Sequence, residues 1–397
     1  MPAIRRDFLK SAFGAAASSQ SRILGANDRI RLAGLGTGGR CRYLLGLANR
    51  IGGCEIAAVC DVYEPRRAEA REKLAPEARE IADYRAVLDR KDIDAVIIGS
   101  PDHWHVPMSI DSVRAGKDVY VEKPVSHKMD EGLALIQAVE QTGRILQVGY
   151  QQRSWDIFRL GFELVRGGRL GQVTMAESHW YQDYIRNFGK LGPVETAKLD
   201  WKRFLGPAPD QPFDPRRFLQ WRWYWDFGGG ALTDLYSHWG DVIHWYLGED
   251  SPLAATAQGA KLYHKHWDCP DTIAAAWQYP SYTASYNGTL VGHLEGGTLV
   301  FRGSEGMMRI TREGLALYPE GVLAAERTNY PEPVVTARST GDGTIEHVRN
   351  FFDCIRSRKP PNSGVRSAVA SARAAHLGNE AYRKGAVARF TAAPAKG

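Results

Sequence analysis

A glycine-rich turn at residues 34–39 constrains the fold of this chain more than any other feature. An apolar run over 29–36 ends in the glycines, and a helical pattern follows. The spacing G-x-G-x-x-G is met by Gly34, Gly36 and Gly39. In this pattern the first glycine permits a tight turn, the second lets the backbone approach a pyrophosphate, and the third allows close contact between helix and strand. The helix N-terminus favours the anion. The turn therefore predicts a dinucleotide-binding unit.

A carboxylate stands where such a unit needs one. Residues 54–60 form a second apolar strand, and Asp61 follows it, 22 residues beyond Gly39. A carboxylate at this distance accepts hydrogen bonds from the adenosine ribose. It also repels a 2′-phosphate, so we expect NAD rather than NADP. Arg66 and Arg67 follow closely and keep NADP open as the less favoured cofactor.

Further strands are predicted at 95–99 and 118–121, with a helix over 107–115 between them. Strands that alternate with helices are typical of a parallel, doubly wound sheet, and ligands bind beyond the carboxyl ends of its strands. We therefore expect an α/β fold with an N-terminal Rossmann dinucleotide-binding domain over 28–150. Core volume is ample, since the chain has 397 residues, of which 44% are hydrophobic.

Two loops at the expected carboxyl ends carry reactive side chains. One is 100–105, with His103 and His105, and the other is Glu122-Lys123-Pro124. The two histidines lack a third ligand at a usual spacing, so no metal is expected, and they are expected to line the cofactor cleft. Lys123 directly follows a buried strand, which is unusual for a solvated lysine. An ion pair with Glu122 is the structural alternative.

Four ordered motifs together resemble the glucose-fructose oxidoreductase and inositol dehydrogenase family, Gfo/Idh/MocA. They are the glycine turn at 34–39, the loop 101–105, the tripeptide 122–124, and Gly228-Gly229-Gly230-Ala231-Leu232-Thr233-Asp234 continuing to 238–241. The run 346–351 extends the resemblance towards the C-terminus. The resemblance implies a Rossmann domain followed by a C-terminal α/β domain with a large open, mostly antiparallel sheet.

The resemblance also implies a cofactor site that uses both loops. The residues expected to contact NAD are Gly34, Gly36, Thr37, Gly38, Gly39, Arg40, Asp61, Ser100, Pro101, Asp102, Trp104, His105, Glu122, Lys123 and Gln151.

For catalysis, the resemblance implies that Lys123 and His238 bracket the reacting hydroxyl, assisted by Asp234. The last two are four residues apart and would share a helix face. A carboxylate beside an imidazole raises its basicity, which suits a general base. A surface ion pair is the structural alternative. The lysine ammonium would stabilise a developing alkoxide.

Further residues are expected to bind substrate. An aromatic segment over 221–227 has three tryptophans in five residues, and indole faces stack on sugar C–H surfaces. Core packing beneath the next helix explains it equally well. No phosphate-specific or carboxylate-specific motif is seen, so a neutral polyol or sugar is favoured. The expected substrate contacts are Lys123, Tyr150, Arg153, His179, Tyr181, Arg222, Trp223, Asp234 and His238.

The second domain, over 151–397, is predicted to bind substrate and to form the oligomer. Strand-like segments at 172–180, 273–278, 288–293 and 298–302 lack regular crossover helices, which favours antiparallel pairing. The family resemblance implies a homodimer or homotetramer through this sheet. An Ala-rich helix at 366–382 is expected to dock on the first domain.

The positive charge of the chain is concentrated at its start. The net charge is +6, but residues 1–50 hold nine of the 51 Lys and Arg and only two of the 45 Asp and Glu. Because the remainder is nearly neutral, no nucleic-acid partner is expected. Residues 1–27, with Arg5, Arg6 and a short Ala/Gly run, resemble a twin-arginine export signal; a basic surface helix is the alternative. We expect a periplasmic protein without membrane insertion, or a cytoplasmic one if the leader is not a signal.

Five scattered cysteines without CxxC argue against a disulfide framework, which fits folding and cofactor loading before export. The leading hypothesis is an NAD-dependent oxidoreductase acting on a sugar, glycoside or cyclitol hydroxyl. The first alternative is a glycosidase that oxidises its substrate transiently, eliminates the aglycone, adds water and returns the hydride. The second is a sugar-binding protein that retains NAD without catalysis.

Overall fold

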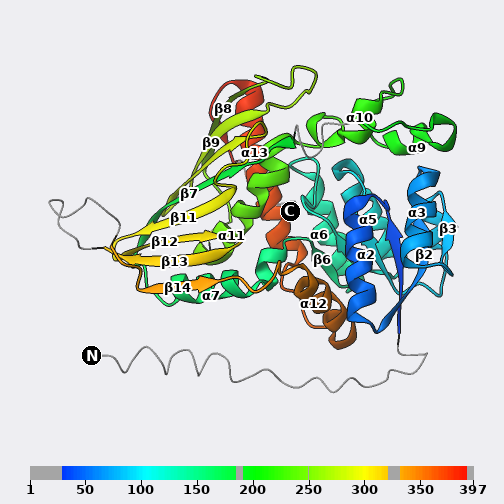
Figure 1. Cartoon of the computed structure of the whole chain (residues 1–397), viewed down its shortest axis with the longest axis horizontal. Coiled ribbons are helices and arrows are strands. Elements are labelled where there is room, and N and C mark those ends of the chain that lie inside the picture. Colours follow the sequence, from blue (N-terminus) through cyan, green and yellow to red (C-terminus); the bar gives the residue numbers. More distant parts are fainter. Residues whose placement is uncertain (1–28, 185–190, 249, 321–330, 391–397) are drawn as a thin grey trace.

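The computed structural model describes residues 29–184, 191–248, 250–320 and 331–390, and in these the chain forms two sheets. Figure 1 shows the two sheets side by side, with the long helix α13 (Val365–Lys384) between them. The predicted export leader lies outside the described residues. No helix in the described part of the chain is long and apolar enough to cross a membrane.

The first sheet is parallel throughout, in the order β3-β2-β1-β4-β5-β6. This order reverses direction between β1 and β4, and such a switch point is where ligands bind at the strand ends. The strands are β1 (Ile30–Leu35), β2 (Cys54–Cys60), β3 (Arg79–Ile81), β4 (Ala95–Ile98), β5 (Asp118–Val121) and β6 (Leu146–Val148). The helices are α2 (Gly39–Ile51), α3 (Glu64–Leu74), α4 (Tyr84–Leu88), α5 (His105–Arg114) and α6 (Glu131–Thr142).

The predicted Rossmann fold is confirmed. Strand β4 is buried along its whole length, which is why it reads as an uninterrupted apolar run. Strands β3 and β6 were not predicted. Each has only three residues, too few to show a period, and β3 contains two charged residues at the edge of the sheet.

The second sheet has the order β14-β13-β12-β11-β7-β10-β9-β8-β15. Its pairs are antiparallel except β7 with β10, so the predicted, mostly antiparallel sheet is confirmed. Its strands are β7 (Val173–Tyr181), β8 (Ala254–Ala260), β9 (Thr272–Gln278), β10 (Thr283–Thr289), β11 (Gly297–Gly303), β12 (Gly306–Thr311), β13 (Gly314–Pro319), β14 (Val335–Arg338) and β15 (Ala388–Arg389).

One strand prediction in this sheet is wrong. A strand was expected at 288–293, whereas β10 ends at Thr289. Inward-facing Ala284 and Tyr286 are buried, but the outward positions are small and polar. The contrast in hydrophobicity between the two faces of β10 is therefore small. The residues after it are more apolar, and the strand was for that reason predicted too far along the chain.

Helices cover the inner face of this sheet. The chief ones are α7 (Asp156–Arg166), the π-helical turn η6 (Leu232–Tyr236) and α11 (Ser237–Leu247), while α12 (Thr344–Ser357) lies against the first domain at α2. The other short helices are η2 (Asp102–Trp104), η3 (Gln151–Ser154), η4 (Thr196–Lys198), α9 (Trp201–Leu205), α10 (Pro215–Leu219) and η5 (Trp221–Trp223).

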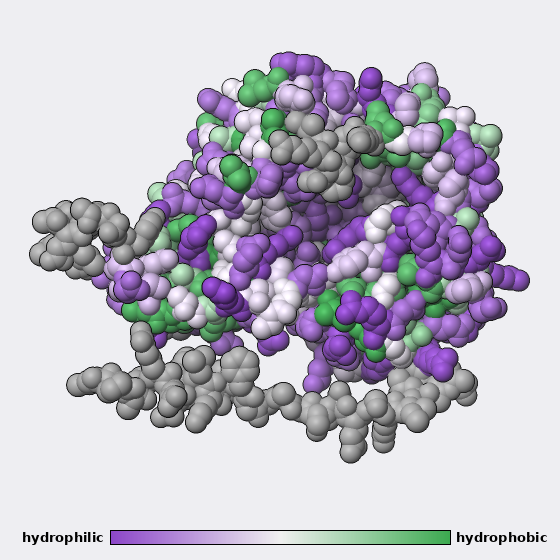
Figure 2. All heavy atoms as spheres, viewed as in Figure 1, coloured by the Kyte–Doolittle hydropathy of each residue, from purple (hydrophilic) through white to green (hydrophobic). Residues whose placement is uncertain are grey.

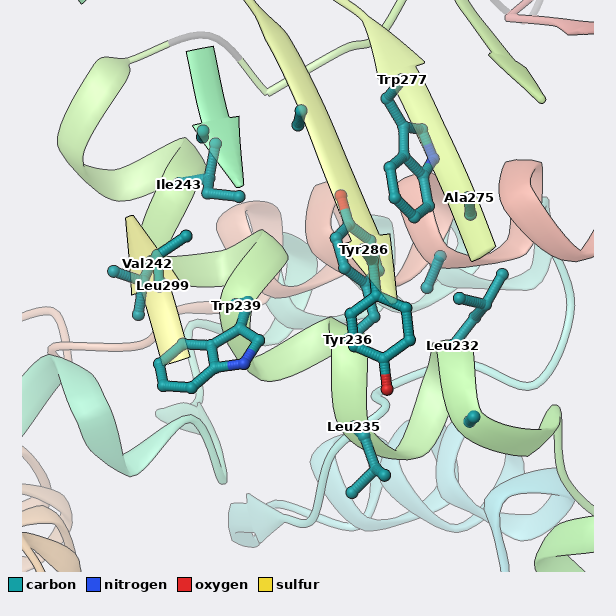
Figure 3. Close-up of a cluster of buried hydrophobic side chains, with 14 of the residues drawn as sticks. Leu232, Leu235, Tyr236, Trp239, Val242, Ile243, Ala275, Trp277, Tyr286 and Leu299 are labelled. Atoms are coloured by element: carbon teal, nitrogen blue, oxygen red, sulfur yellow. The ribbon is translucent and has the colours of Figure 1, made fainter. Parts of the chain in front are cut away.

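An aromatic core fixes η6 and α11 against the sheet (Figure 3). The Tyr236 ring stacks on Trp277 of β9, with centroids 3.9 Å apart and planes 4° apart. Trp239, one turn on, is fully buried. Burying an aromatic side chain of this size stabilises the fold by roughly 2–3 kcal/mol. The helical segment that carries Asp234 and His238 is therefore rigidly held by the sheet.

Helix α13 contacts both domains. In the first domain, Gly132 of α6 packs against Val369, so closely that a Cβ atom there would lie 2.8 Å from the valine methyl. In the second, Trp277 Nε1 donates a hydrogen bond of 2.8 Å to the Ala374 carbonyl. The Asn379 side chain donates to the Gly229 carbonyl at 2.7 Å. The helix thus connects both domain cores to the glycine-rich segment that precedes η6.

Candidate active site

A cleft of about 890 Å³ lies between the two domains, at the carboxyl ends of β1, β2, β4 and β5. Figure 2 shows the molecule hollowed there, with hydrophilic residues around the hollow. All the predicted cofactor residues except Gly34 and Thr37 line it: Gly36, Gly38, Gly39, Arg40, Asp61, Ser100, Pro101, Asp102, Trp104, His105, Glu122, Lys123 and Gln151. Their roles in binding stay a prediction.

The structural roles of the three motif glycines differ from those expected. Gly34, not Gly39, allows the close contact between helix and strand, because a Cβ on Gly34 would lie 2.7 Å from Leu45 of α2. Nothing lies within 4 Å of a Cβ built on Gly39. Gly36 makes the turn: its φ is +74°, and its Cβ would lie 2.6 Å from the Ser100 backbone. The assignment of helix contact to Gly39 is therefore wrong.

Asp61 lies at the end of β2 and is 5% exposed. One carboxylate oxygen accepts a hydrogen bond of 2.9 Å from the Tyr63 amide. Burial raises the pKa of this carboxyl, while the nearby Arg66 guanidinium lowers it. The second oxygen is available for a ribose hydroxyl.

The loop 100–105 is held by its two histidines. His105 places its ring nitrogens 2.7 Å from the Pro124 carbonyl and 2.9 Å from the Ser100 carbonyl. His103 Nε2 lies 2.9 Å from the Phe204 carbonyl. Both rings therefore hold loops together. His105 lines the cleft, whereas His103, which was also expected to line it, does not. Among the described residues no three His, Cys, Asp or Glu side chains are grouped to bind a metal.

Lys123 reaches across the cleft to the second domain. Its Nζ donates hydrogen bonds to the carbonyl oxygen of Asp234, at 2.6 Å, and to its carboxylate, at 2.9 Å. Glu122 pairs instead with Arg40, whose Nε lies 2.8 Å from the glutamate oxygen. The alternative of a Lys123–Glu122 ion pair is therefore wrong.

Asp234 is the centre of the charged network. It accepts from Lys123, from Arg222 Nε at 3.2 Å and from the Tyr184 hydroxyl at 3.0 Å. Burial would raise the pKa of this carboxyl, but Lys123 and Arg222 outweigh burial and hold the pKa well below its usual range. Asp234 therefore stays ionised and keeps both cations in place.

His238 has a different partner from the one expected. Its Nδ1 lies 3.1 Å from the amide oxygen of Gln152, and its ring lies 5.5 Å from the Trp180 indole. Burial, with the positive charges of Lys123 and Arg312, holds its pKa well below 6.5. The expected Asp234–His238 pair is wrong, because the π-helical turn η6 directs Asp234 towards Lys123.

Four predicted substrate residues do not line the cleft. Tyr150 is fully buried with its ring edge-on to His238. Arg153 forms an ion pair with Asp241, at 2.8 and 3.0 Å. The rings of His179 and Tyr181 stack on each other, 4.6 Å apart. These four side chains lie outside the lining of the cleft, and their predicted contacts with substrate stay a prediction.

Strand geometry explains the residue that was missed. Successive side chains on a strand point to opposite faces, so His179 and Tyr181 share one face and Trp180, between them, takes the other. Trp180 lines the cleft. Tyr184, Trp267 and Arg312 also line it without having been predicted. The alternation of β7 was the available signal for Trp180.

The aromatic segment 221–227 serves both purposes that were considered. Trp221 and Trp223 line the cleft, and the Arg222 guanidinium lies 4.2 Å from the centroid of Trp221. Trp223 is nevertheless 2% exposed and stacks on Trp267 at 4.9 Å, and Phe227 is fully buried in the core. One end of the segment thus faces the cleft and the other supports it.

The residues present fit a dinucleotide. Ser100 Oγ, in the lining of the cleft beside the glycine turn, is buried without a hydrogen-bond partner in the described chain, and the start of helix α2 faces the same space. Buried polar groups normally have partners. A pyrophosphate at the helix N-terminus would supply them, and Asp61 would hold the ribose.

Two family models match the chain. One, described as "Oxidoreductase family, NAD-binding Rossmann fold", matches 29–150, and the other, "GFO/IDH/MocA C-terminal domain", matches 185–309. The chain belongs to the Gfo/Idh/MocA family. Its first domain is an NAD-binding Rossmann domain, and the two matches together extend over more than half of the sequence.

Named members of the Gfo/Idh/MocA family include dehydrogenases and a glycosidase. Inositol 2-dehydrogenase of Salmonella typhimurium is 30% identical over 140 residues, 35% of this chain and 42% of that protein. Levoglucosan dehydrogenase of Pseudarthrobacter phenanthrenivorans is 26% identical over 47% of this chain and 43% of its own length. Alpha-N-acetylgalactosaminidase of Tannerella forsythia is 26% identical over 48% and 46%. The chain spans less than half the length of the curated relatives it matches.

Solved structures of the Gfo/Idh/MocA type share the fold over nearly the whole chain. Levoglucosan dehydrogenase in complex with NADH and levoglucosan has a TM-score of 0.72 at 20% identity, covering 92% of this chain and 100% of that one. The WlbA dehydrogenase from Chromobactrium violaceum, in complex with NADH and UDP-GlcNAcA, has a TM-score of 0.71 at 20% identity, covering 94% and 100%.

Proposed function

We propose that this protein is an NAD-dependent oxidoreductase that oxidises a hydroxyl group of a sugar, glycoside or cyclitol. One observation carries the proposal: Lys123, at the edge of the NAD-binding domain, is bonded to Asp234 in the same cleft that His238 lines. A protein that only bound a sugar would have no need of a buried base and a partly buried ammonium beside a dinucleotide site.

His238 is suited to take the hydroxyl proton. The Gln152 amide oxygen can only accept a hydrogen bond, so His238 Nδ1 donates and Nε2 keeps a free lone pair. Its lowered pKa keeps the imidazole neutral at physiological pH. A neutral imidazole with a free Nε2 is a competent proton acceptor.

Lys123 is suited to hold the oxygen that loses the proton. Its Nζ has three donors, and Asp234 takes two of them through its carbonyl and carboxylate oxygens. The third is free for the substrate oxygen, whose developing negative charge an ammonium stabilises. When bound, NAD accepts the hydride from the substrate carbon, and the chain supplies orientation and charge.

The test begins with protein purified without added cofactor, which we expect to hold NAD or to bind it on addition. Incubation with sugars and cyclitols, including inositol and levoglucosan, should then produce the NADH absorbance. His238→Asn should abolish turnover and retain the cofactor. Turnover equal to that of the parent protein in His238→Asn would remove this residue from the reaction.

A glycosidase that uses NAD catalytically is the second candidate, favoured by the relatives named as an alpha-N-acetylgalactosaminidase and as glycosyl hydrolase family 109 proteins. The same groups would serve, since elimination and addition of water need only an acid and a base. Release of the aglycone from aryl glycosides without net NADH would favour this candidate, whereas NADH accumulation would favour the dehydrogenase.

We propose that residues 1–27 direct export by the twin-arginine route. Support comes from the sequence alone, through Arg5, Arg6 and the short apolar run after them. Fusing 1–27 to a reporter should move the reporter to the periplasm. Replacement of both arginines by lysine should retain it in the cytoplasm, and unchanged export would contradict the proposal.

Self-association through the second sheet is the corresponding proposal for assembly. The outward positions of β9 include exposed Ala274 and Ala276, and small side chains let two sheet faces approach closely. Light scattering coupled to size exclusion should give a dimer or tetramer. Ala276→Arg should reduce the assembly to monomers, and a monomeric parent protein would refute the proposal.

A further inference from the structure

Arg312 is a cation of the cleft without an anionic partner among the described residues. Lys123 and Arg222 share Asp234, and Arg40 is paired with Glu122. Arg312, which lines the same cleft, forms no ion pair or hydrogen bond with any residue that the structure describes, and its Nε atom is buried without a partner. Buried polar groups normally have partners, and an unpaired charge is costly.

The side chain of Arg312 is held in place rather than solvated. The residue lies in the turn between β12 and β13, where Thr311 Oγ1 accepts hydrogen bonds from the amides of Glu313 and Gly314, at 3.1 and 3.2 Å. Its guanidinium lies 4.6 Å from the centroid of the Trp180 indole. Stacking on an indole occupies the face of the guanidinium and leaves its N–H edge available.

The Arg312 guanidinium is close to the reacting centre. Trp180 contacts both Arg312 and His238, with its ring 5.5 Å from the imidazole, and the charge of Arg312 contributes to the lowered pKa of His238. Burial and the charge of Arg40 lower the pKa of Arg312 itself to about 10. The guanidinium is therefore one indole ring away from the proposed base, in a region with excess positive charge.

We propose that Arg312 binds a carboxylate group of the substrate, so that the protein acts on a sugar acid rather than on a neutral sugar. This inference rests on the proposed function, because it names the substrate class of the same cleft. A guanidinium edge matches the two oxygens of a carboxylate. A phosphate carries about −1.5 to −2 charges at pH 7, which exceeds the single positive charge of Arg312. Arg66, the other lining cation without an ion pair among the described residues, lies near Asp61.

Three probes that differ only at one sugar carbon provide the test. Glucose, glucuronate and glucose 6-phosphate carry a hydroxymethyl, a carboxylate and a phosphate group there, and galactose and mannose give the same series with other ring configurations. Isothermal titration of the NAD-loaded protein should give about 10-fold or greater preference for the carboxylate over the neutral probe in at least one series.

Substitution then assigns the preference to Arg312. Arg312→Gln should remove the preference by lowering the affinity for the carboxylate probe alone. Arg312→Lys should retain part of the preference because the positive charge remains. Arg309→Gln is the matched control, since Arg309 is exposed on β12, the strand that precedes Arg312, and does not line the cleft. Thermal unfolding of each variant, monitored by circular dichroism, checks that it is folded.

Equal affinity for the carboxylate and the neutral probe in every series would overturn the inference. So would a stronger affinity for the phosphate probe, or an Arg312→Gln variant that weakens both probes alike. The proposed function can fail separately. If the protein binds the carboxylate probe through Arg312 but reduces NAD with no sugar acid, the carboxylate site stands and the dehydrogenase activity is refuted.

Discussion

Lys123 and Asp234 belong to different domains, and each sets the state of the other. The carboxylate anchors an ammonium that would otherwise be free to turn towards solvent, and the ammonium keeps the carboxyl ionised although it is buried. A buried carboxylate that loses one partner bears an unbalanced charge. The two side chains therefore act as a unit, and their substitutions should not be additive.

Replacement of Lys123 by methionine should reduce kcat by about 10²–10⁴-fold, the range usual for loss of a proton-transfer or charge-stabilising group. NAD occupancy should change little, since the pyrophosphate and ribose contacts remain. Steady-state kinetics and release of bound nucleotide measure the two effects. Lys128→Met, at an exposed position, is the matched control, and equal kcat in both variants would contradict the assignment.

Asp61→Ala should weaken NAD binding more than NADP binding. The carboxylate accepts from the ribose in NAD and repels the 2′-phosphate of NADP, while the nearby Arg66 is free to attract that phosphate once the carboxylate has gone. Fluorescence titration with both reduced cofactors measures the ratio. An equal loss for the two would refute the ribose assignment.

Among elements, the turn between β1 and α2 is the most constrained. Gly36 has a positive φ, and a side chain there would meet the Ser100 backbone, which cannot move like the end of a flexible side chain. Gly36→Ala should therefore destabilise the cofactor-free protein by about 1–3 kcal/mol, measured by urea unfolding. It should also weaken NAD binding.

Gly39→Ala separates stability from binding. Because no atom lies within 4 Å of the added methyl group, the free energy of unfolding without cofactor should change by less than about 0.5 kcal/mol. NAD affinity should still fall, since the methyl group would occupy the space for the pyrophosphate. Unchanged affinity would show that the phosphate does not approach Gly39.

The elements also show which inferences the sequence permitted. Strands β2 and β5 were predicted with their observed bounds because buried parallel strands are continuous apolar runs. The partners of Asp234 and His238 were not predictable, because a spacing of four residues implies a shared face only in a regular α-helix. The π-helical turn η6 has a different period. His179 and Tyr181 were predicted to contact substrate because of their polar groups. They share one face of β7, and Trp180 on the other face is the residue that lines the cleft.

At the scale of the whole molecule, burial keeps the histidines neutral. Desolvation is the largest cause of a lowered pKa in ten of the eleven histidines. In His347 it lowers the pKa to about 4. The ten are His103, His105, His127, His179, His238, His244, His264, His266, His347 and His376. Burial raises the pKa of Asp61, Asp102 and Glu131, which has the opposite effect on stability.

Acid should therefore destabilise the protein at mild pH. Below about pH 6.5 the unfolded chain gains protons at histidines that stay neutral when folded, so stability is full above this pH and falls as the pH approaches 4. The lowered pKa of His347 alone should reduce the free energy of unfolding by up to about 3 kcal/mol at pH 4. The thermal midpoint, measured by calorimetry, should decrease steadily between pH 6.5 and 4, and a constant midpoint over this range would contradict the prediction.

The bond between Lys123 and Asp234 also joins the two halves of the molecule, and this has a consequence for the order of events. A motion that widens the cleft enough to admit a reactant must break the bond, leaving Asp234 with Arg222 and Tyr184, both from the second domain. The ammonium returns to its place only when the halves close again. Completion of the charge arrangement would then follow admission of the reactant, and an empty, open molecule would be chemically idle.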